Sequence, residues 1–200
     1  MDTLVPFAAT EPKTRLDDIL SAAERDDFSR AMLLDVCEAV SDAGGDPTVL
    51  STADVDCPYP VVVDDRPLSE AVNARLDPLT AVVMADLALA TPDAIERLYE
   101  ADAEVAIAPG LGGGTNALVV RHPEFRVDYH DTSVRDHRDI AAAVGASTAT
   151  VDSFRLAVDI DERRDLAEVL LHGEGRAKRW LETAGFELDS GTGRTLVSRA

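Results

Sequence analysis

Residues 81–120 read AVVMADLALATPDAIERLYEADAEVAIAPGLGGGTNALVV. They contain one strand signal before a helix signal, one after it, and a third strand signal after a glycine-rich loop. The three apolar runs have the length and composition of buried strands and cover residues 81–84, 105–108 and 117–120. Thr91 followed by Pro92 combines an N-cap with a proline at the first helical position, which predicts a helix through Leu98. Strands that alternate with helices favour an α/β fold with a mainly parallel sheet.

The alternation of strand and helix signals extends over the rest of the chain. Ser21 with Glu24 three residues later is a capping box, and the helix it predicts carries an apolar stripe of Phe28, Met32, Val36 and Val40. Further strands are predicted at residues 4–7, 48–50, 61–63 and 156–160, and further helices at residues 68–76, 133–144 (capped by Ser133) and 165–171. The tail after Gly175 is predicted to form a helix and then a small hairpin around residues 191–193. No repeat or linker interrupts the pattern, so residues 1–200 are predicted to form a single domain.

The most unusual global feature of the chain is its charge. Its 200 residues include 38 acidic and 19 basic ones, a formal net charge of −19, and Lys13 and Lys178 are its only lysines. An acidic, lysine-poor surface is typical of cytoplasmic proteins of extreme halophiles. Such a surface is tolerated there because the Debye length in molar salt is roughly 3 Å, so most of the repulsion among the carboxylates is screened. A generally acidic mesophilic protein is the alternative. Such a surface repels nucleic acids and anionic membranes, so neither is an expected partner.

Sorting signals and recognisable metal or triad motifs are not found in the sequence. The longest apolar stretches have about five residues, too few for a membrane span, and no secretory signal is predicted, which favours a cytoplasmic location. Cys37 and Cys57 are expected to be reduced thiols, although a disulfide stays open. The four histidines have no metal-ligand spacing and are expected at the surface or in packing: His122, His130, His137 and His172.

The first candidate site is the loop after the first predicted strand. It contains Lys13 and Arg15, two cations at the carboxyl end of a strand, where α/β sheets bind ligands. A lysine offers a point charge to a phosphate and an arginine offers a bidentate fork. The pair predicts a phosphate site, and a solvated loop with incidental charges is the alternative.

Acidic residues follow two other predicted strands. Asp86 comes directly after the run at residues 81–84, where a carboxylate can hold a magnesium ion whose other ligands are phosphate oxygens and water. Asp159 and Asp161 lie at the end of the predicted strand at residues 156–160, and alternation puts both carboxylates on one side of it. This arrangement would place one of them beside Asp86 across the sheet and complete a metal site. The alternatives are a turn at Asp86 and a helix cap at the later pair.

The glycine-rich loop is the third candidate. Gly112 and Gly113 lie in a run of three glycines, which lets backbone N–H groups approach an anion, and Thr115 and Asn116 add side-chain donors. The loop is neither a Walker A motif nor a dinucleotide fingerprint. A flexible turn is the alternative reading.

Taken in order, these motifs resemble the 2-phospho-L-lactate guanylyltransferase family of coenzyme F420 biosynthesis over nearly the whole chain. The motifs that carry the resemblance are Val5-Pro6, Lys13-Thr14-Arg15-Leu16, Arg30-Ala31-Met32-Leu33 with Asp35-Val36, Ala85-Asp86-Leu87 with Leu89, Thr91 and Pro92, Gly113-Gly114-Thr115-Asn116-Ala117-Leu118, Tyr129 with Ser133 and His137, and Asp159-Ile160-Asp161 with Asp165-Leu166. Only the Gly-Thr-Asn motif is specific by itself. The sequence departs from the family at Ala8-Ala9, where a lysine is usual, and at His130, where a glycine often stands.

The resemblance implies a nucleotide-diphospho-sugar transferase-like (GT-A-like) three-layer fold with a twisted, mostly parallel sheet. It also implies that the phosphate of 2-phospho-L-lactate attacks the α-phosphorus of GTP, giving lactyl-2-diphospho-5′-guanosine and pyrophosphate. Carried over by position, Asp86, Asp159 and Asp54 are the expected Mg²⁺ ligands, and Thr115 and Ser133 hold the phosphate or carboxylate of the acceptor. A homodimer is expected at the level of the family.

Two alternatives to this function stay open on the sequence. One is a nucleotidyltransferase with another acceptor, such as phosphoenolpyruvate, the molybdenum cofactor or a sugar phosphate. The other is a nucleotide-binding module without catalytic turnover, against which the joint presence of Lys13, Asp86 and Asp159 argues.

Overall fold

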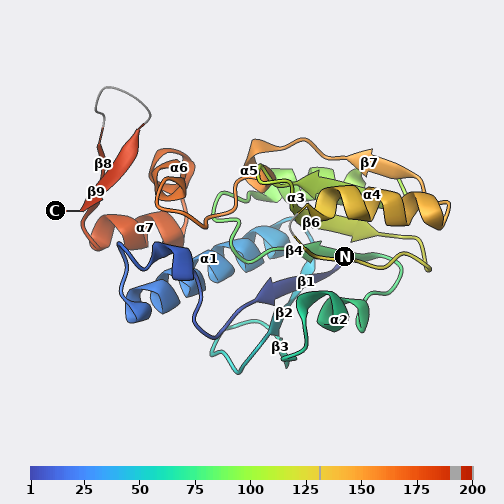
Figure 1. The fold of residues 1–200 in the computed structure, drawn as a ribbon, viewed down its shortest axis with the longest axis horizontal. Coiled ribbons are helices and arrows are strands. Elements are labelled where there is room, and N and C mark those ends of the chain that lie inside the picture. The colour runs from blue at the N-terminus through green and yellow to red at the C-terminus, as the bar shows by residue number, and fades with distance from the viewer. Residues whose placement is uncertain (131, 190–194, 200) are drawn as a thin grey trace.

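The computed structural model describes residues 1–130, 132–189 and 195–199. In this part of the chain a seven-stranded sheet has helices on both faces, and a two-stranded ribbon lies near the C-terminus (Figure 1). The strands are β1 (Asp2–Phe7), β2 (Asp46–Ser51), β3 (Val61–Val63), β4 (Thr80–Val83), β5 (Val105–Pro109), β6 (Thr115–Val120), β7 (Thr148–Thr150), β8 (Phe186–Asp189) and β9 (Leu196–Arg199). The helices are η1 (Thr14–Leu16, a 3₁₀ turn), α1 (Ala22–Asp42), α2 (Leu68–Asn73), α3 (Pro92–Glu100), α4 (Ser133–Ala143), α5 (Phe154–Ala157), α6 (Asp165–His172) and α7 (Arg176–Thr183).

The order of the strands explains how the sheet gathers distant loops. It runs β3-β2-β1-β4-β6-β5-β7, and all neighbouring pairs are parallel except the two that involve β6. Because β6 is antiparallel, its first residues lie at the same edge as the last residues of β4 and β5. The register pairs Val83 with Ala117, and the N–H of Met84 donates to the carbonyl of Asn116. The predicted α/β class with a mostly parallel sheet is confirmed.

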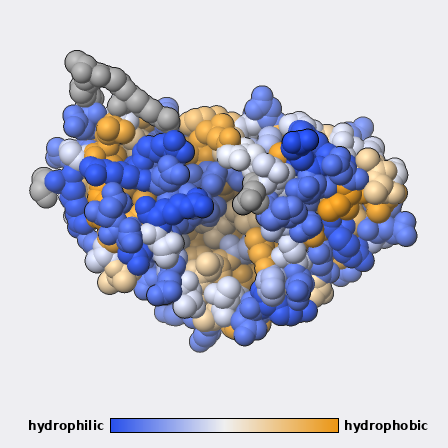
Figure 2. Space-filling model, in the orientation of Figure 1, coloured by the Kyte–Doolittle hydropathy of each residue, from blue (hydrophilic) through white to orange (hydrophobic). Residues whose placement is uncertain are grey.

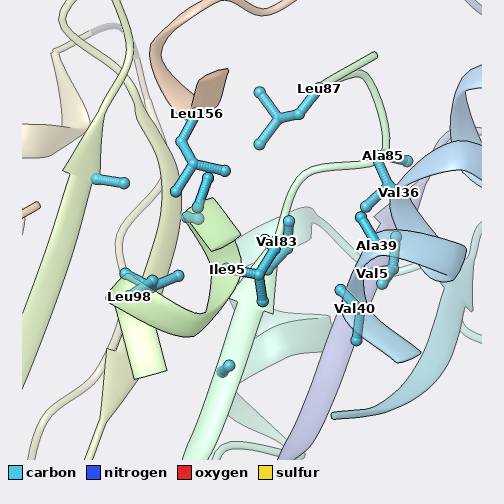
Figure 3. Packing of buried hydrophobic residues seen from close by; sticks show 14 of the residues in the cluster. Val5, Val36, Ala39, Val40, Val83, Ala85, Leu87, Ile95, Leu98 and Leu156 are labelled. Atoms are coloured by element: carbon cyan, nitrogen blue, oxygen red, sulfur yellow. The ribbon is translucent and has the colours of Figure 1, made fainter. Parts of the chain in front are cut away.

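Successive side chains of a strand point to opposite faces of the sheet, so the sheet has a separate hydrophobic core on each face. Val5 and Val83 face Val36 of α1 and Ile95 of α3 (Figure 3). Their sequence neighbours point to the other face, where they pack with α2 and α4; this second cluster includes Leu4, Val82, Leu118, Val72 and Ala141. The layers are therefore helix, sheet and helix, as expected for α/β folds.

Local signals account for the long helices. The capping box at α1 is present, since Glu24 N–H donates to Ser21 Oγ while the Glu24 carboxylate accepts from Ser21 N–H. Thr91 caps α3, and Pro92 is its first residue. Both predictions are confirmed. At α4 the cap is Thr132 rather than Ser133, which is the first helical residue and whose hydroxyl is used elsewhere.

The predicted strand at residues 156–160 is wrong. Residues 154–157 form the short helix α5, and the chain then continues without regular structure. The alternating pattern has another cause: Leu156 is buried in the core between the sheet, α1 and α3, whereas Val158 and Ile160 are buried in a third core under α6 and α7. The sequence missed β7, a short edge strand with little buried surface. Strands β8 and β9 pair antiparallel, in agreement with the predicted hairpin, and the residues predicted for its turn, 191–193, lie outside the described residues.

Hydrophilic side chains cover most of the face shown in Figure 2. Across the described ranges, no helix is both long and apolar enough to cross a membrane.

Candidate functional site

Lys13 is held between two carboxylates at the edge of the sheet. Its Nζ lies 2.8 Å from Asp86 Oδ2 and 2.7 Å from Asp161 Oδ1, and its side chain is only 11% exposed. Asp86 follows β4, Asp161 precedes α6, and Lys13 itself has a left-handed backbone at the start of η1. Burial would lower the pKa of Lys13, but the charges of Asp86 and Asp161 outweigh burial and raise it. The ammonium group therefore stays charged, in a site that carries one more acid than cation.

Asp86 and Asp159 have properties of a site that accepts a further cation. Asp86 Oδ1 is buried and has no hydrogen-bond partner among the described residues. Burial, and after it the charge of Asp86, raises the pKa of Asp159, because a second carboxylate nearby disfavours its ionised form. Carboxylate oxygens are the ligands that Mg²⁺ prefers, so this donor set fits the predicted ion. The described residues contain no preformed group of three metal-ligating side chains.

Asn116 links this acidic centre to β6. Its Nδ2 donates to the carbonyl of Leu156 at 3.0 Å and to Asp159 Oδ1 at 3.3 Å, so both amide hydrogens are used within the protein. A Cβ at Gly110 would lie 2.5 Å from Asn116 Oδ1, which explains the glycine at this position. The contacts of Asn116 orient Asp159.

Thr115, the neighbour of Asn116, points to the opposite side of β6, as alternation requires. Its hydroxyl lies 2.8 Å from Nδ1 of His137, and its backbone N–H donates to Ser133 Oγ at 2.9 Å. All three residues are buried, with Thr115 and Ser133 at 3% exposure and His137 at 0%. Ser133 and His137 are one turn apart on α4, which presents both to the same strand.

The glycine loop contains a hydrogen bond between two of its own backbone groups. Gly113 has a φ of 89°, a left-handed conformation that favours glycine, and its N–H donates to the carbonyl of Gly110. At Gly112 an added Cβ would meet open space. The predicted role of Gly112 and Gly113 in nucleotide binding stays a prediction.

A cavity of about 490 Å³ opens beside Lys13. It extends from the acidic centre over the ends of β1 and β2 to the loop after β3, and its polar lining includes Lys13, Arg15, Asp86, Asp161, Asp64 and Arg66. Thr115 and Ser133 lie outside this lining. The geometry therefore provides two neighbouring centres, one cationic and acidic beside a cavity, and one of buried hydroxyl groups.

The structure brings some predicted residues together and separates others. Arg15 has a side chain that is 70% exposed, and its Nη1 lies 3.4 Å from Asp161 Oδ2. Asp54 is exposed in the loop after β2 and does not line the cavity. Asp159 and Asp161 were both candidates for an acid beside Asp86, and the structure places Asp161 against Lys13, with Nζ 2.7 Å from its Oδ1. His137 was expected to be a surface or packing histidine; its spacing of four from Ser133 was the signal that could have revealed it.

Comparison with known proteins adds independent information. A family model described as "Guanylyl transferase CofC like" matches residues 1–199. The chain is 63% identical over 199 residues to the 2-phospho-L-lactate guanylyltransferase of Natronomonas pharaonis, with 100% of this chain and 99% of the relative covered. It is 60% identical over 203 residues to the protein of the same name from Haloferax volcanii, with 100% and 98% covered.

Solved structures resemble the chain in fold. A protein of Desulfovibrio desulfuricans described as a nucleotide-diphospho-sugar transferase superposes with a TM-score of 0.71 at 14% identity, covering 91% of this chain and 94% of that one. A nucleotidyl transferase from Methanothermobacter gives a TM-score of 0.57 at 15% identity, with 91% and 98% covered. At these identities the likeness concerns the fold, and it confirms the predicted nucleotide-diphospho-sugar transferase-like architecture.

Proposed function

The chain belongs to the family of CofC-like guanylyl transferases, and on that premise we propose that it transfers GMP from GTP to 2-phospho-L-lactate. The products are lactyl-2-diphospho-5′-guanosine and pyrophosphate. One structural observation supports the proposal most: a buried lysine between two acids and a pair of buried hydroxyls lie at the same edge of the sheet. One centre suits a metal-bound triphosphate, and the other suits a small anion.

We assign Mg²⁺ to Asp86 and Asp159, with Asp161 in the same acidic group. The orphaned Asp86 Oδ1 and the raised pKa of Asp159 both support this assignment. When bound, the ion would polarise the phosphoryl oxygens and neutralise charge on the triphosphate. Asp54 is exposed outside the cavity, and nothing in the geometry supports it as a third ligand.

Lys13 and Arg15 are the catalytic cations of the proposal. Both reactants are anions, so their repulsion must be offset before attack, and both side chains line the cavity. Lys13 would exchange its contacts with Asp86 and Asp161 for phosphate oxygens and stabilise the leaving pyrophosphate. The attacking phosphate is already ionised, so the reaction requires no general base.

Thr115 and Ser133 are assigned to the acceptor and Lys13 to the nucleotide, which predicts opposite kinetic effects. Thr115→Val should lower kcat/KM for 2-phospho-L-lactate about tenfold or more, since a hydrogen bond to a charged group contributes roughly 1.5–3 kcal/mol. Lys13→Ala should mainly impair the use of GTP. Steady-state kinetics with each substrate varied in turn measure both effects. If Thr115→Val weakened GTP use and left acceptor use unchanged, the assignment of the two substrates would be reversed.

The function itself is tested by a screen for pyrophosphate release. The purified chain is incubated in high potassium chloride with each of the four ribonucleoside triphosphates against 2-phospho-L-lactate, phosphoenolpyruvate and sugar phosphates. We expect turnover with GTP and 2-phospho-L-lactate. Preference for another acceptor would favour a different nucleotidyltransferase, and binding of GTP without pyrophosphate release from any mixture would indicate a module without turnover.

We also propose that the chain works as a cytoplasmic, halophilic protein, because of its net charge of −19. The midpoint of thermal unfolding should rise by roughly 10 °C or more between low and molar potassium chloride, which corresponds to several kcal/mol for a chain of this size. Sucrose is the control, since it stabilises folded proteins without screening charge. An unchanged midpoint in potassium chloride would contradict the proposal.

We also propose, at the level of the family, that the chain forms a homodimer. Sedimentation in the same salt tests this proposal.

A further inference from the structure

His137 is fully buried, and both of its ring nitrogens have protein partners. The backbone N–H of Asp128 donates to Nε2 at 3.0 Å, and Nδ1 lies 2.8 Å from Thr115 Oγ1. A backbone N–H can only donate, so Nε2 carries no proton. A neutral imidazole then has its proton on Nδ1. The direction of the second bond follows: His137 Nδ1–H donates, and the hydroxyl of Thr115 accepts.

The same reasoning applies to the neighbouring hydroxyl. The N–H of Thr115 donates to Ser133 Oγ at 2.9 Å. Both hydroxyl oxygens therefore accept a bond from the protein, and neither hydroxyl hydrogen is donated to another group within the described ranges. Each hydroxyl has one hydrogen to give, so the pair is left as two donors. Two hydroxyl donors suit a phosphate or carboxylate, which can only accept when ionised.

We propose that His137 is a positioning residue that fixes the hydroxyl of Thr115 as a hydrogen-bond donor to the anionic group of the acceptor. The inference rests on the proposed function and extends it to a residue that does not itself touch substrate. In the other tautomer Nδ1 would accept from Thr115, and the threonine would present a lone pair to the anion. His137 thus prevents a repulsive arrangement at the acceptor site.

The surroundings of His137 keep it in one state. Its ring packs near those of Phe125, at a centroid distance of 6.0 Å, and Tyr129, at 5.0 Å in an edge-on geometry. Burial lowers the pKa of His137 to about 4, against the opposing charges of Asp128 and Asp136. The imidazole is therefore neutral at physiological pH, and the backbone of Asp128 selects its tautomer.

The tautomer is tested first by ¹⁵N NMR of histidine-labelled protein without substrate, which reports which ring nitrogen carries the proton. The His137→Gln variant identifies the resonance by its loss. We expect the Nδ1–H form for His137. The Nε2–H form, or a doubly protonated ring at neutral pH, would overturn the inference whatever the enzyme's substrate.

Kinetics then test the positioning role with two matched variants. His137→Asn keeps a donor where Nδ1 was, and His137→Gln keeps an acceptor where Nε2 was. We expect His137→Gln to lower kcat/KM for 2-phospho-L-lactate about tenfold more than His137→Asn, with the KM for GTP unchanged in both. Unfolding measurements on both variants separate this effect from loss of the folded state.

Combination with Thr115→Val completes the test. If His137 acts through the hydroxyl of Thr115, His137→Gln costs nothing further in the Thr115→Val background. Fully additive losses, or equal losses in the two His137 variants, would overturn the inference. These outcomes differ from failure of the proposed function, in which the unmodified protein itself would release no pyrophosphate with 2-phospho-L-lactate.

Discussion

Replacement of Asp86 by asparagine is expected to lower kcat about a thousandfold while the chain stays folded. Asp86 Oδ1 is buried and has no hydrogen-bond partner in the described part of the chain, and its Oδ2 contacts Lys13. Asparagine has the same shape but cannot neutralise a metal ion, so several kcal/mol of transition-state stabilisation are lost. A loss of roughly 4 kcal/mol corresponds to about a thousandfold in rate. Pyrophosphate release at saturating GTP, acceptor and magnesium measures the effect, and circular dichroism monitors the fold.

The matched control is the same exchange at Asp54. This carboxylate was also predicted as a metal ligand, but it is exposed and does not line the cavity. Asp54→Asn should retain nearly full kcat. Near-normal activity of Asp86→Asn would remove the basis for the metal assignment, and a large loss in Asp54→Asn would return Asp54 to the set of ligands.

Asp35→Ala is expected to destabilise the chain by about 3 kcal/mol. The carboxylate of Asp35 reaches from α1 to the first turn of α7, where it accepts from the N–H groups of Arg176 at 2.7 Å and Ala177 at 2.8 Å. It is 8% exposed, so its removal leaves backbone donors of α7 without a partner. A Cβ at Gly175 would lie 2.3 Å from Asp35 Oδ2, so Gly175→Ala should disturb the same contact.

Glu38→Ala is the control for the ion pair at this position. Glu38 contacts the same arginine, Arg176, but is 51% exposed, and exposed pairs contribute roughly 0–1 kcal/mol. Urea unfolding in high potassium chloride gives both free energies. Equal losses in Asp35→Ala and Glu38→Ala would mean that the ion pair, and not the cap of α7, carries the stability.

The motif that contains Asp35 illustrates how family motifs mix structure and function. Arg30 to Val36 was recognised as a family segment of the first long helix, without a role for its acid. The structure shows that the carboxylate of Asp35 accepts hydrogen bonds at the N-terminus of α7, from Arg176, 141 residues further along the chain. The third core joins the same helices, since it contains Phe28 and Met32 of α1, Leu166 of α6 and Leu181 of α7.

Local patterns in the sequence were sufficient to predict several features of the structure. The α/β class, the capping box at Ser21 and the start of α3 at Pro92 depend on residues within a few positions of one another. The same is true of an acid that follows a buried strand, as at Asp86. Such features are fixed by backbone hydrogen bonding and by the periodicity of burial, which a single sequence displays directly.

Other features depended on which elements became neighbours. The antiparallel insertion of β6 beside β4, the contact of Lys13 with Asp161 and the tautomer of His137 each join residues from different elements. The residues at 156–160 carried a strand-like pattern because two separate cores bury them in turn. The sequence by itself determined the elements and the chemical groups of the site. Only the tertiary structure decided their pairing, because periodicity records that a side chain is buried and not which partner buries it.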